Sequence, residues 1–349
     1  MKTLVIIDKH DSAIGRAAYA RNKSQDFQIL SASDYISPHQ LFREIVRLQP
    51  DVLFFAWRGA LISLLSRTKL PRRIVEKLAK TSIAMLIPDL AGLSPKGREI
   101  EAVLVRYVDY YLVTSKELFT LYSINFPSKP PVGLYRDMPD VHTIKDLSNS
   151  QRDRTTSSVI WVGNSRWGIH QGFQDHKGLH ELALPLQERL RDTHKFRIID
   201  SAISFVPHQQ VLQEIQSSEI LIQTSNSEGT GLPLLEAAGL GTVPVTTNVG
   251  IASDFLIDDL KHLVAESNVD SFENAINSAL ENYQFFSKRL KERFEQYINE
   301  ISSDELVVKC VAKPKEATRI QLLFSILDDI KWLRRWFYAR KENFRFDPQ

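Results

Sequence analysis

One segment of the sequence constrains the fold and the chemistry of this chain more than any other. It begins at Glu228, reads EGTGLPLLEAAGLGTVPV, and directly follows the apolar run EILIQT at 219–224. A short apolar run of this kind is typical of a buried strand. Pro233 suits the first turn of a helix, where its missing N–H group costs nothing. The sequence therefore predicts a strand, a glycine-rich turn and a helix over 232–239.

This turn has the properties of an anion-binding site. Free backbone N–H groups and the positive end of the helix dipole face whatever lies above it, which suits a diphosphate. Glu228 precedes the turn, and Glu236 lies about two helical turns along the predicted helix. Both carboxylates would then border one pocket and accept hydrogen bonds from hydroxyl groups.

The segment resembles the Glu-x7-Glu signature of the retaining family 4 glycosyltransferases, which have the GT-B fold and use sugar nucleotides. The usual form is close to EGFGLPxxEAxAxGxPV, and Thr230 stands where phenylalanine is common. The resemblance implies that Glu228 contacts hydroxyl groups of the transferred sugar and that Glu236 contacts the ribose. It also implies that the turn residues hold the donor: Gly229, Thr230, Gly231 and Leu232. An ordinary surface turn is the alternative.

Apolar runs alternate with helical patterns through both halves of the chain, which favours two doubly wound α/β sheets of parallel strands. The predicted strands are 3–7, 28–31, 52–56, 83–87, 111–114, 159–163, 196–199, 220–223, 243–246 and 262–264. The predicted helices include 39–48, 70–81, 96–107, 270–301 and 318–341. We therefore expect an α/β protein of the GT-B class, with two Rossmann-like domains facing across a cleft and C-terminal helices.

The polar segment 146–158 has no apolar period and is typical of a linker. It divides the chain into a first, acceptor-side domain over 1–150 and a donor nucleotide-sugar domain over 151–312. The remaining residues, 313–349, form a predicted helical tail that interleaves aromatic and basic residues. We expect the tail to pack back on the first domain, with anchoring at a membrane interface as the alternative.

Two basic residues follow the first strand of the second half. Lys177-Gly178 matches the K-G pair of the family, whose lysine holds the donor diphosphate. Asn164 occupies the place of the family arginine, so Arg166, two residues later, is the candidate for that role. Fixed cations at this place would stabilise the departing nucleoside diphosphate. A solvated surface cation is the alternative for each.

Three weaker candidates come from loops. Asp89 follows a predicted strand where the family often has His-Asp, and Pro88 replaces the histidine. Asp89 would either touch a substrate or cap the next turn. Gly15 lies in a segment that corresponds to a cleft-lining loop of the family. Val206 lies two residues before His208, where the family binds the nucleobase with backbone groups.

The charge is unevenly spread along the chain. Residues 1–150 carry 21 Lys/Arg and 15 Asp/Glu, while residues 151–312 carry 14 and 22. The acidic centre argues against nucleic-acid binding, and the basic first domain, with its stretch 67–80, suits an anionic acceptor or an anionic membrane surface. The single Cys310 excludes an internal disulfide, and no long apolar run or signal peptide is recognised. We expect a cytoplasmic protein, with possible peripheral contact at the inner face of the membrane.

These features together predict a retaining glycosyltransferase that uses a UDP- or GDP-sugar and no other cofactor. No Asp-x-Asp motif occurs and the histidines lack metal-ligand spacing, so no metal site is expected. The acceptor would be a glycan or lipid-linked glycan, as in surface polysaccharide assembly. The alternatives are a GT-B sugar-nucleotide epimerase and a catalytically inactive GT-B partner protein, and Pro88 and Asn164 keep the second of these open.

Overall fold

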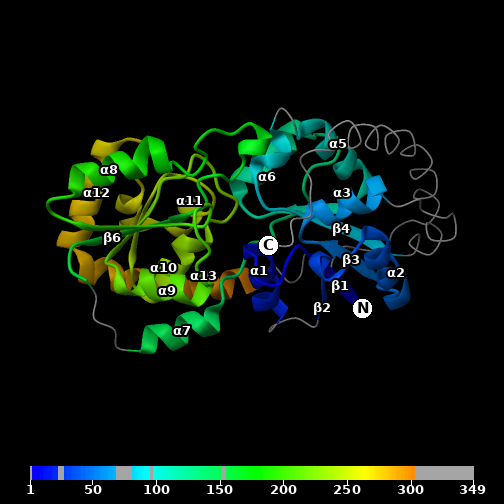
Figure 1. The fold of residues 1–349 in the computed structure, drawn as a ribbon, viewed down its shortest axis with the longest axis horizontal. Coiled ribbons are helices and arrows are strands. Elements are labelled where there is room, and N and C mark those ends of the chain that lie inside the picture. Colours follow the sequence, from blue (N-terminus) through cyan, green and yellow to red (C-terminus); the bar gives the residue numbers. More distant parts are fainter. Residues whose placement is uncertain (1, 23–26, 68–80, 95–96, 151–154, 303–349) are drawn as a thin grey trace.

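The computed structural model describes residues 2–22, 27–67, 81–94, 97–150 and 155–302, which form two α/β domains (Figure 1). The predicted helices 70–81 and 318–341, the basic stretch 67–80, Cys310 and the tail 313–349 lie mostly or wholly outside these residues. Within the described residues, no helix is long and apolar enough to cross a membrane.

The first domain is built on a five-stranded parallel sheet in the order β2-β1-β3-β4-β5. Alternate residues of the strands enter two separate apolar layers, with Leu4 and Ile6 on one face and Val5 and Ile7 on the other. Burial on both faces explains why these strands are continuous apolar runs rather than alternating ones. The strands are β1 (Thr3–Ile7), β2 (Phe27–Ser31), β3 (Val52–Phe55), β4 (Ser82–Ile87) and β5 (Tyr110–Val113).

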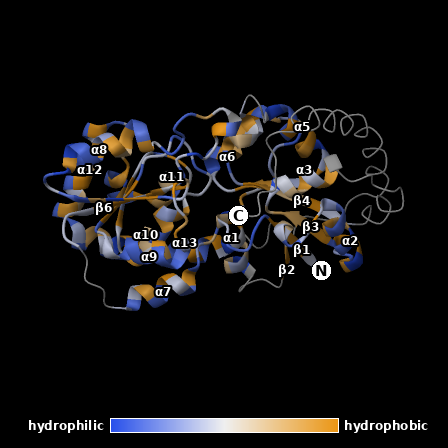
Figure 2. Cartoon of the chain, in the orientation of Figure 1, coloured by the Kyte–Doolittle hydropathy of each residue, from blue (hydrophilic) through white to orange (hydrophobic). Residues whose placement is uncertain are grey.

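Helices cover both faces of this sheet, and hydropathy colouring shows apolar residues concentrated in the strands and on the inner faces of helices (Figure 2). Helix α2 illustrates the pattern, because Leu41, Phe42 and Ile45 are buried while its other face is polar. The described helices of this domain are α1 (Ala13–Asn22), α2 (Pro38–Leu48), α3 (Arg58–Arg67), α5 (Arg98–Tyr107) and α6 (Lys116–Asn125), with short 3-10 turns at Ala32–Asp34 and Leu90–Leu93.

The second domain has a four-stranded parallel sheet in the order β7-β6-β8-β9. Its strands are β6 (Ser158–Gly163), β7 (Lys195–Asp200), β8 (Ile220–Gln223) and β9 (Val243–Thr246). A π-helical turn (Leu179–Ala183) leads into the first of its helices. The helices are α8 (Leu184–Leu190), α9 (His208–Ser217), α10 (Leu232–Leu240), α11 (Ala252–Phe255), α12 (Val269–Glu281) and α13 (Tyr283–Ser302), with 3-10 turns at Ile169–Gln171 and Asp258–Leu263. The predicted pair of parallel α/β domains is confirmed.

The predicted linker 146–158 was partly wrong. Its first residues belong to helix α7 (Val141–Asn149), which begins at the capping residue Asp140. Helix α7 packs against α9 and α10, and Met138 and Ile144 are buried in the core of the second domain. The polar composition of 146–149 therefore marks the solvent-facing end of a helix that rests on the second domain, rather than a free connection.

Two further predictions were wrong near the end of the described chain. Residues 262–264 do not form a strand. His262 and Leu263 belong to the 3-10 turn Asp258–Leu263. Val264 follows this turn and makes only an isolated bridge to Thr246. The predicted helix 270–301 is two helices that break at Asn282, whose side-chain amide donates to the Ser278 carbonyl. Asparagine competes in this way with the backbone hydrogen bonds of a helix, so it favours a break.

The order of the strands positions the site. In each sheet the chain turns in opposite directions from a central pair, β1 and β3 in the first sheet and β6 and β8 in the second. Ligands of doubly wound sheets bind beyond the carboxyl ends of the strands at such a switch point. The loops that follow β1, β6 and β8 are therefore the expected place for a binding site.

Candidate functional site

A cleft of about 310 Å³ lies between the two domains, at the carboxyl ends of their strands. Loops that follow β1 and β4 line it from the first domain, and loops that follow β6 and β8 line it from the second. The two domains are in close contact beside it. A Cβ atom added at Gly229 would lie 1.6 Å from the carbonyl oxygen of Pro88, so a glycine is needed there.

The glycine-rich turn has the predicted form. It connects β8 to α10, and the observed helix begins at Leu232 as expected. Gly231 has a φ of 81°, a left-handed conformation that favours glycine, and Pro233 lies in the first helical turn. Residues 227–233 all line the cleft. The N-terminus of α10 therefore lies at the cleft, and although Pro233 has no N–H group and that of Leu234 donates to Gly231, the positive end of the helix dipole there suits a phosphate group.

Lys177 and Glu228 meet in the cleft. The Lys177 Nζ lies 2.5 Å from the Glu228 Oε1, and the two side chains are 18% and 15% exposed. Ser225 donates its hydroxyl to the same oxygen at 2.6 Å. Gly178, which follows the lysine, has a φ of 64°, and a Cβ there would lie 2.1 Å from the carbonyl oxygen of Thr224. The close approach of these two loops explains why a glycine follows Lys177.

Glu236 lies in a separate cluster. It is buried on α10, and its Oε1 lies 2.8 Å from the Nε2 of His208, the first residue of α9. Val206 is half-buried just before α9 and packs against the core of the second domain. Glu236, Val206 and His208 are not among the residues that line the cleft. Glu236 thus lies beside His208, next to the segment around Val206 that the resemblance assigns to nucleobase binding. It does not share the cleft with Glu228.

Arg166 and Gly15 do not line the cleft. Arg166 is exposed and near Asp200. Burial acts to raise the pKa of Asp200, but hydrogen bonds from Ser165 and Ala202 and the charge of Arg166 lower it overall. Gly15 is the third residue of α1, not part of a loop, and its N–H donates to the capping hydroxyl of Ser12. A Cβ at Gly15 would lie 2.0 Å from the Lys9 carbonyl oxygen, so this glycine is required by packing.

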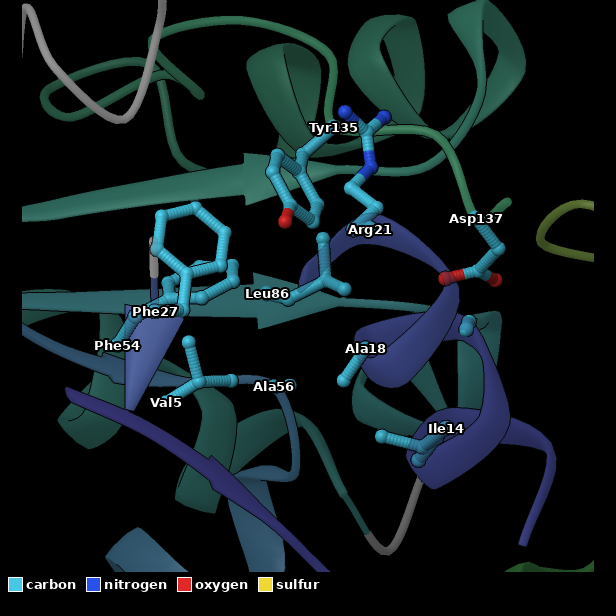
Figure 3. Close-up of a pocket in the computed structure, with 11 residues that line it drawn as sticks. Val5, Ile14, Ala18, Arg21, Phe27, Phe54, Ala56, Leu86, Tyr135 and Asp137 are labelled. Carbon is cyan, nitrogen blue, oxygen red and sulfur yellow. The ribbon is translucent and has the colours of Figure 1, made fainter. Parts of the chain in front are cut away.

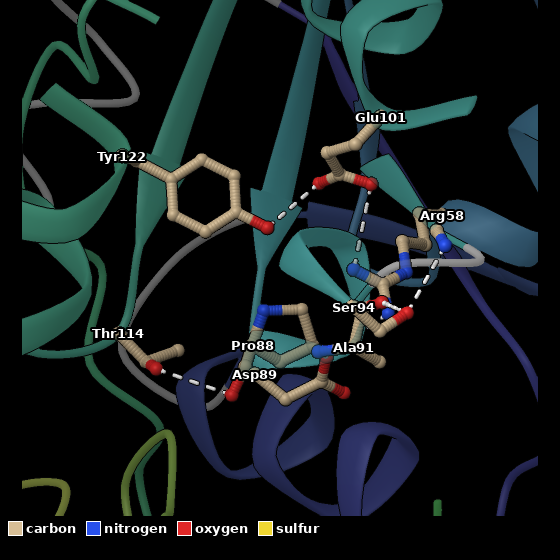
Figure 4. A network of polar contacts seen from close by, with 9 residues as sticks. Arg58, Pro88, Asp89, Ala91, Ser94, Glu101, Thr114 and Tyr122 are labelled. Atoms are coloured by element: carbon tan, nitrogen blue, oxygen red, sulfur yellow. Dashed lines mark hydrogen bonds and ion pairs between the residues drawn. The ribbon is translucent and has the colours of Figure 1, made fainter. Parts of the chain in front are cut away.

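Asp89 lines the cleft and also caps the turn that follows β4, so the two alternatives hold together. Its Oδ1 accepts from the N–H of Ala91 and lies 2.9 Å from the Nη2 of Arg58. Behind it, Arg58 lies 3.5 Å from the Oε2 of Glu101, and the hydroxyl of Tyr122 donates to the other oxygen of Glu101 (Figure 4). Burial acts to lower the pKa of Arg58, but Asp89 and Glu101 raise it overall, so the guanidinium stays charged.

Several cleft residues were missed by the sequence analysis. Asp137, just before α7, accepts a hydrogen bond at 3.0 Å from the hydroxyl of Thr230, across the domain boundary. Asp137 also lines a second cavity, together with Ile14, Ala18 and Arg21 of α1 (Figure 3). Burial raises the pKa of Asp137 to about 6. Asp137 lies within the predicted first domain and directly follows no predicted strand, so no pattern in the sequence singled it out as a cleft residue.

Trp167 and His176 also line the cleft. Their ring centroids are 4.4 Å apart, and the ring of Phe173 lies 5.0 Å from that of His176. Burial and the charge of Lys177 lower the pKa of His176, so its imidazole is neutral at pH 7. The aromatic group therefore supports the loop that carries Lys177 without adding a cation to the cleft.

The raised pKa of Asp137 predicts a pH effect on stability. The folded protein binds a proton at Asp137 up to about pH 6, whereas the unfolded chain releases it near pH 4. The contribution of this group to the free energy of unfolding therefore falls as the pH rises from 4 to 6. An Asp137→Asn variant has no carboxyl group to titrate at this position. Its stability should therefore rise relative to that of the wild type as the pH increases from 4 to 6. Urea unfolding of both proteins at pH 4.5 and pH 7 measures the difference. A difference that does not change with pH would contradict the assignment.

The described residues contain no group of three or more His, Cys, Asp or Glu side chains that could hold a metal ion. The positive groups that face the cleft are Lys177 and the N-terminus of α10. Together they can bind an anion, and the neighbouring carboxylates can accept hydrogen bonds from hydroxyl groups.

Comparison with known sequences supports this description of the second domain. Residues 186–300 match the family model described as Glycosyl transferases group 1. A stretch of 93 residues is 30% identical to one subunit of the phosphatidylinositol N-acetylglucosaminyltransferase of Arabidopsis thaliana. This stretch covers 27% of the chain and only 21% of that protein.

Solved structures resemble this protein over both domains. TarM of S. aureus, solved with fondaparinux, α-GlcNAc-glycerol and UDP, has a TM-score of 0.55 and 14% identity, over 76% of this chain and 57% of its own. HepE of Anabaena, solved with UDP and glucose, has a TM-score of 0.57 and 14% identity, over 88% and 98%. The trehalose-6-phosphate synthase OtsA has a TM-score of 0.59 and 9% identity, over 90% and 100%.

Identities this low establish the fold alone, and the family match covers one domain. The chain spans a fifth of the curated relative and a little over half of TarM. The two parallel-sheet α/β domains agree with the structural comparison. The protein thus has the two-domain GT-B fold, and over residues 186–300 it is similar to the glycosyl transferases group 1.

Proposed function

We propose that this protein is a retaining glycosyltransferase that transfers a sugar from a UDP- or GDP-sugar to a glycan or lipid-linked glycan acceptor. The observation that carries the proposal is the pairing of Lys177 with Glu228 beside the N-terminus of α10. The matched family, the similarity to an N-acetylglucosaminyltransferase and the UDP found with TarM and HepE support a hexose or N-acetylhexosamine donor. Surface polysaccharide assembly is the process that we propose for it.

Each part of the cleft has a role in this reaction. Lys177 and the helix N-terminus bind the diphosphate and stabilise the charge that grows on it as the bond to the sugar breaks. Glu228, which already accepts two hydrogen bonds, accepts from a sugar hydroxyl when Lys177 turns to the phosphate. The acceptor hydroxyl attacks the anomeric carbon on the face that the diphosphate leaves, and its proton passes to the departing diphosphate. In this mechanism Lys177 and the N-terminus of α10 together do the work of a divalent metal.

The direct test is incubation with UDP- and GDP-sugars in the presence and absence of EDTA. Release of free nucleotide and transfer to acceptor are measured, and NMR of the product gives the anomeric configuration. We expect activity that EDTA leaves intact and a product of retained configuration. Interconversion of sugar nucleotides without transfer would instead indicate an epimerase, and nucleotide binding without any turnover would indicate an inactive partner.

A second test concerns the ribose. Glu236 is buried, hydrogen-bonded to His208 and outside the lining of the cleft, and we propose that a bound nucleotide reaches it so that its carboxylate accepts from a ribose hydroxyl. Glu236→Gln should weaken nucleotide binding by about 1–3 kcal/mol, the range for a hydrogen bond to a charged group. Calorimetry with UDP or GDP measures this change. Glu228→Gln is the matched control, because it should lower turnover while the nucleotide still binds. Unchanged nucleotide affinity in Glu236→Gln would contradict the ribose assignment.

A further inference from the structure

Three carboxylates lie on the first-domain wall of the cleft, among hydroxyl and apolar side chains. Asp8, Asp89 and Asp137 all line it, and they come from three separate segments: the loop after β1, the end of β4, and the approach to α7. Of the described residues that line the cleft, the only lysine or arginine is Lys177, which stands on the opposite wall. The wall therefore differs in sign from the first domain as a whole, which has an excess of basic residues.

The protein holds each carboxylate through one oxygen. The contacts of Asp89 with Arg58 and Ala91 both use Oδ1. Thr230 donates to the Oδ2 of Asp137, and the hydroxyl of Ser12 donates to the Oδ1 of Asp8. Arg58 balances the charge of Asp89 from behind the wall, since it does not line the cleft. These hydrogen bonds engage one oxygen of each carboxylate, and all three residues line the cleft.

An ionised carboxylate can only accept hydrogen bonds. A ligand group on this wall must therefore donate, as a hydroxyl or an ammonium does. A carboxylate or phosphate on the ligand would find acceptors where it needs donors, and like charges at close range are strongly unfavourable. The anionic part of the donor has its own place on the opposite wall, at Lys177 and the N-terminus of α10.

We propose that this wall selects an acceptor whose reacting end presents hydroxyl or ammonium groups and no negative charge, with Asp137 as the specificity-determining residue. The inference rests on the proposed transfer reaction and adds the class of its acceptor. Asp137 is the determinant because it lies at the seam of the domains. Thr230, on the same turn as Glu228, holds it in the cleft.

The test uses acceptors that differ only in charge. Octyl glycosides of glucose, galactose and mannose are each compared with the matching uronic acid, and glucose also with glucosamine. The donor is the sugar nucleotide that the protein hydrolyses fastest in water. We expect kcat/KM for the neutral or amino acceptors to exceed that of the matched uronate by about tenfold or more, as an uncompensated charge requires.

Asp137→Asn replaces one carboxylate oxygen with an N–H donor of nearly the same shape. It should reduce the preference against uronates at least fivefold and leave KM for the donor within about twofold. Asp192→Asn, at a carboxylate that is 89% exposed on the second domain, is the matched control and should leave the preference unchanged. If Asp137→Asn does not fold, Thr230→Val removes the hydrogen bond that holds Asp137 and should also narrow the preference.

The outcomes separate the two proposals. Donor hydrolysis with a uronate as the best acceptor, or with transfer to no neutral or amino acceptor, overturns the inference and leaves the transferase proposal standing. If Asp137→Asn leaves the preference for neutral or amino acceptors over uronates unchanged, Asp137 is not the cause of that preference. Failure to bind any nucleoside diphosphate or to hydrolyse any sugar nucleotide is the failure of the transferase proposal itself.

Discussion

Replacement of Arg58 by methionine is expected to lower the free energy of unfolding by about 3–5 kcal/mol, the usual cost of removing one partner from a buried ion pair. Arg58 lies between Asp89 and Glu101, and Glu101 is almost fully buried. Methionine has a similar length but cannot balance either carboxylate. Glu101, whose pKa is already raised by burial, would then have to take up a proton or remain charged in the core.

Urea unfolding at several pH values measures this loss. The loss of stability should shrink as the pH falls, because a protonated Glu101 needs no cation. The native state of the variant binds more protons than its unfolded state, so the stability of the variant declines as the pH rises. Adding Glu101→Gln to the Arg58→Met variant should restore part of the stability at pH 7. Arg47→Met, which removes an exposed ion pair with Glu44, is the control and should cost less than about 0.5 kcal/mol. Equal losses in the two single variants would contradict a buried network.

Replacement of Lys177 by alanine is expected to reduce turnover by about 100- to 1000-fold, the range for removal of one fixed group that stabilises transition-state charge. The substitution has two effects in this cleft. It removes the cation that faces the diphosphate, and it leaves Glu228 as an unbalanced carboxylate beside the same site. Both effects act on phosphate and not on the nucleoside.

Binding measurements distinguish this role from general damage. Lys177→Ala should weaken binding of a nucleoside diphosphate far more than binding of the nucleoside, because the lost contact is to phosphate. Lys145→Ala, at an exposed lysine paired with Glu295, should leave both affinities unchanged. If nucleoside and nucleoside diphosphate lose affinity equally in Lys177→Ala, the lysine is not the phosphate ligand.

Features that depend on local sequence could be predicted. Strands β1, β8 and β9 were predicted with their observed bounds, because buried parallel strands are short apolar runs whatever lies around them. Helix α10 was predicted to begin at Leu232, as observed, because the glycine-rich turn and Pro233 restrict the backbone at that point. The family resemblance singled out Lys177 and Glu228 separately, as a diphosphate ligand and a sugar contact, and their direct pairing was not predicted.

Predictions were less successful where a distant segment decided the outcome. Residues 262–264 have the composition of a strand, but β9 offers them only one bridge. The segment 146–149 is polar, yet it completes a helix because α9 and α10 supply an apolar surface for Ile144. Gly15 was expected in a cleft-lining loop; its neighbours Ser12, Ala13 and Ile14 do line the cleft, but Gly15 itself lies in the first turn of α1.

The sequence by itself therefore determined the two parallel sheets, the turn before α10 and the residue types that can bind a sugar nucleotide, since each follows from backbone preferences and burial over a few residues. Only the tertiary structure decided which groups share the cleft. Thr230 meets Asp137 across 93 positions of sequence, and Arg58 meets Asp89 across 31. Such contacts depend on how helices and domains pack, and that packing places Glu236 beside His208 rather than at the cleft surface.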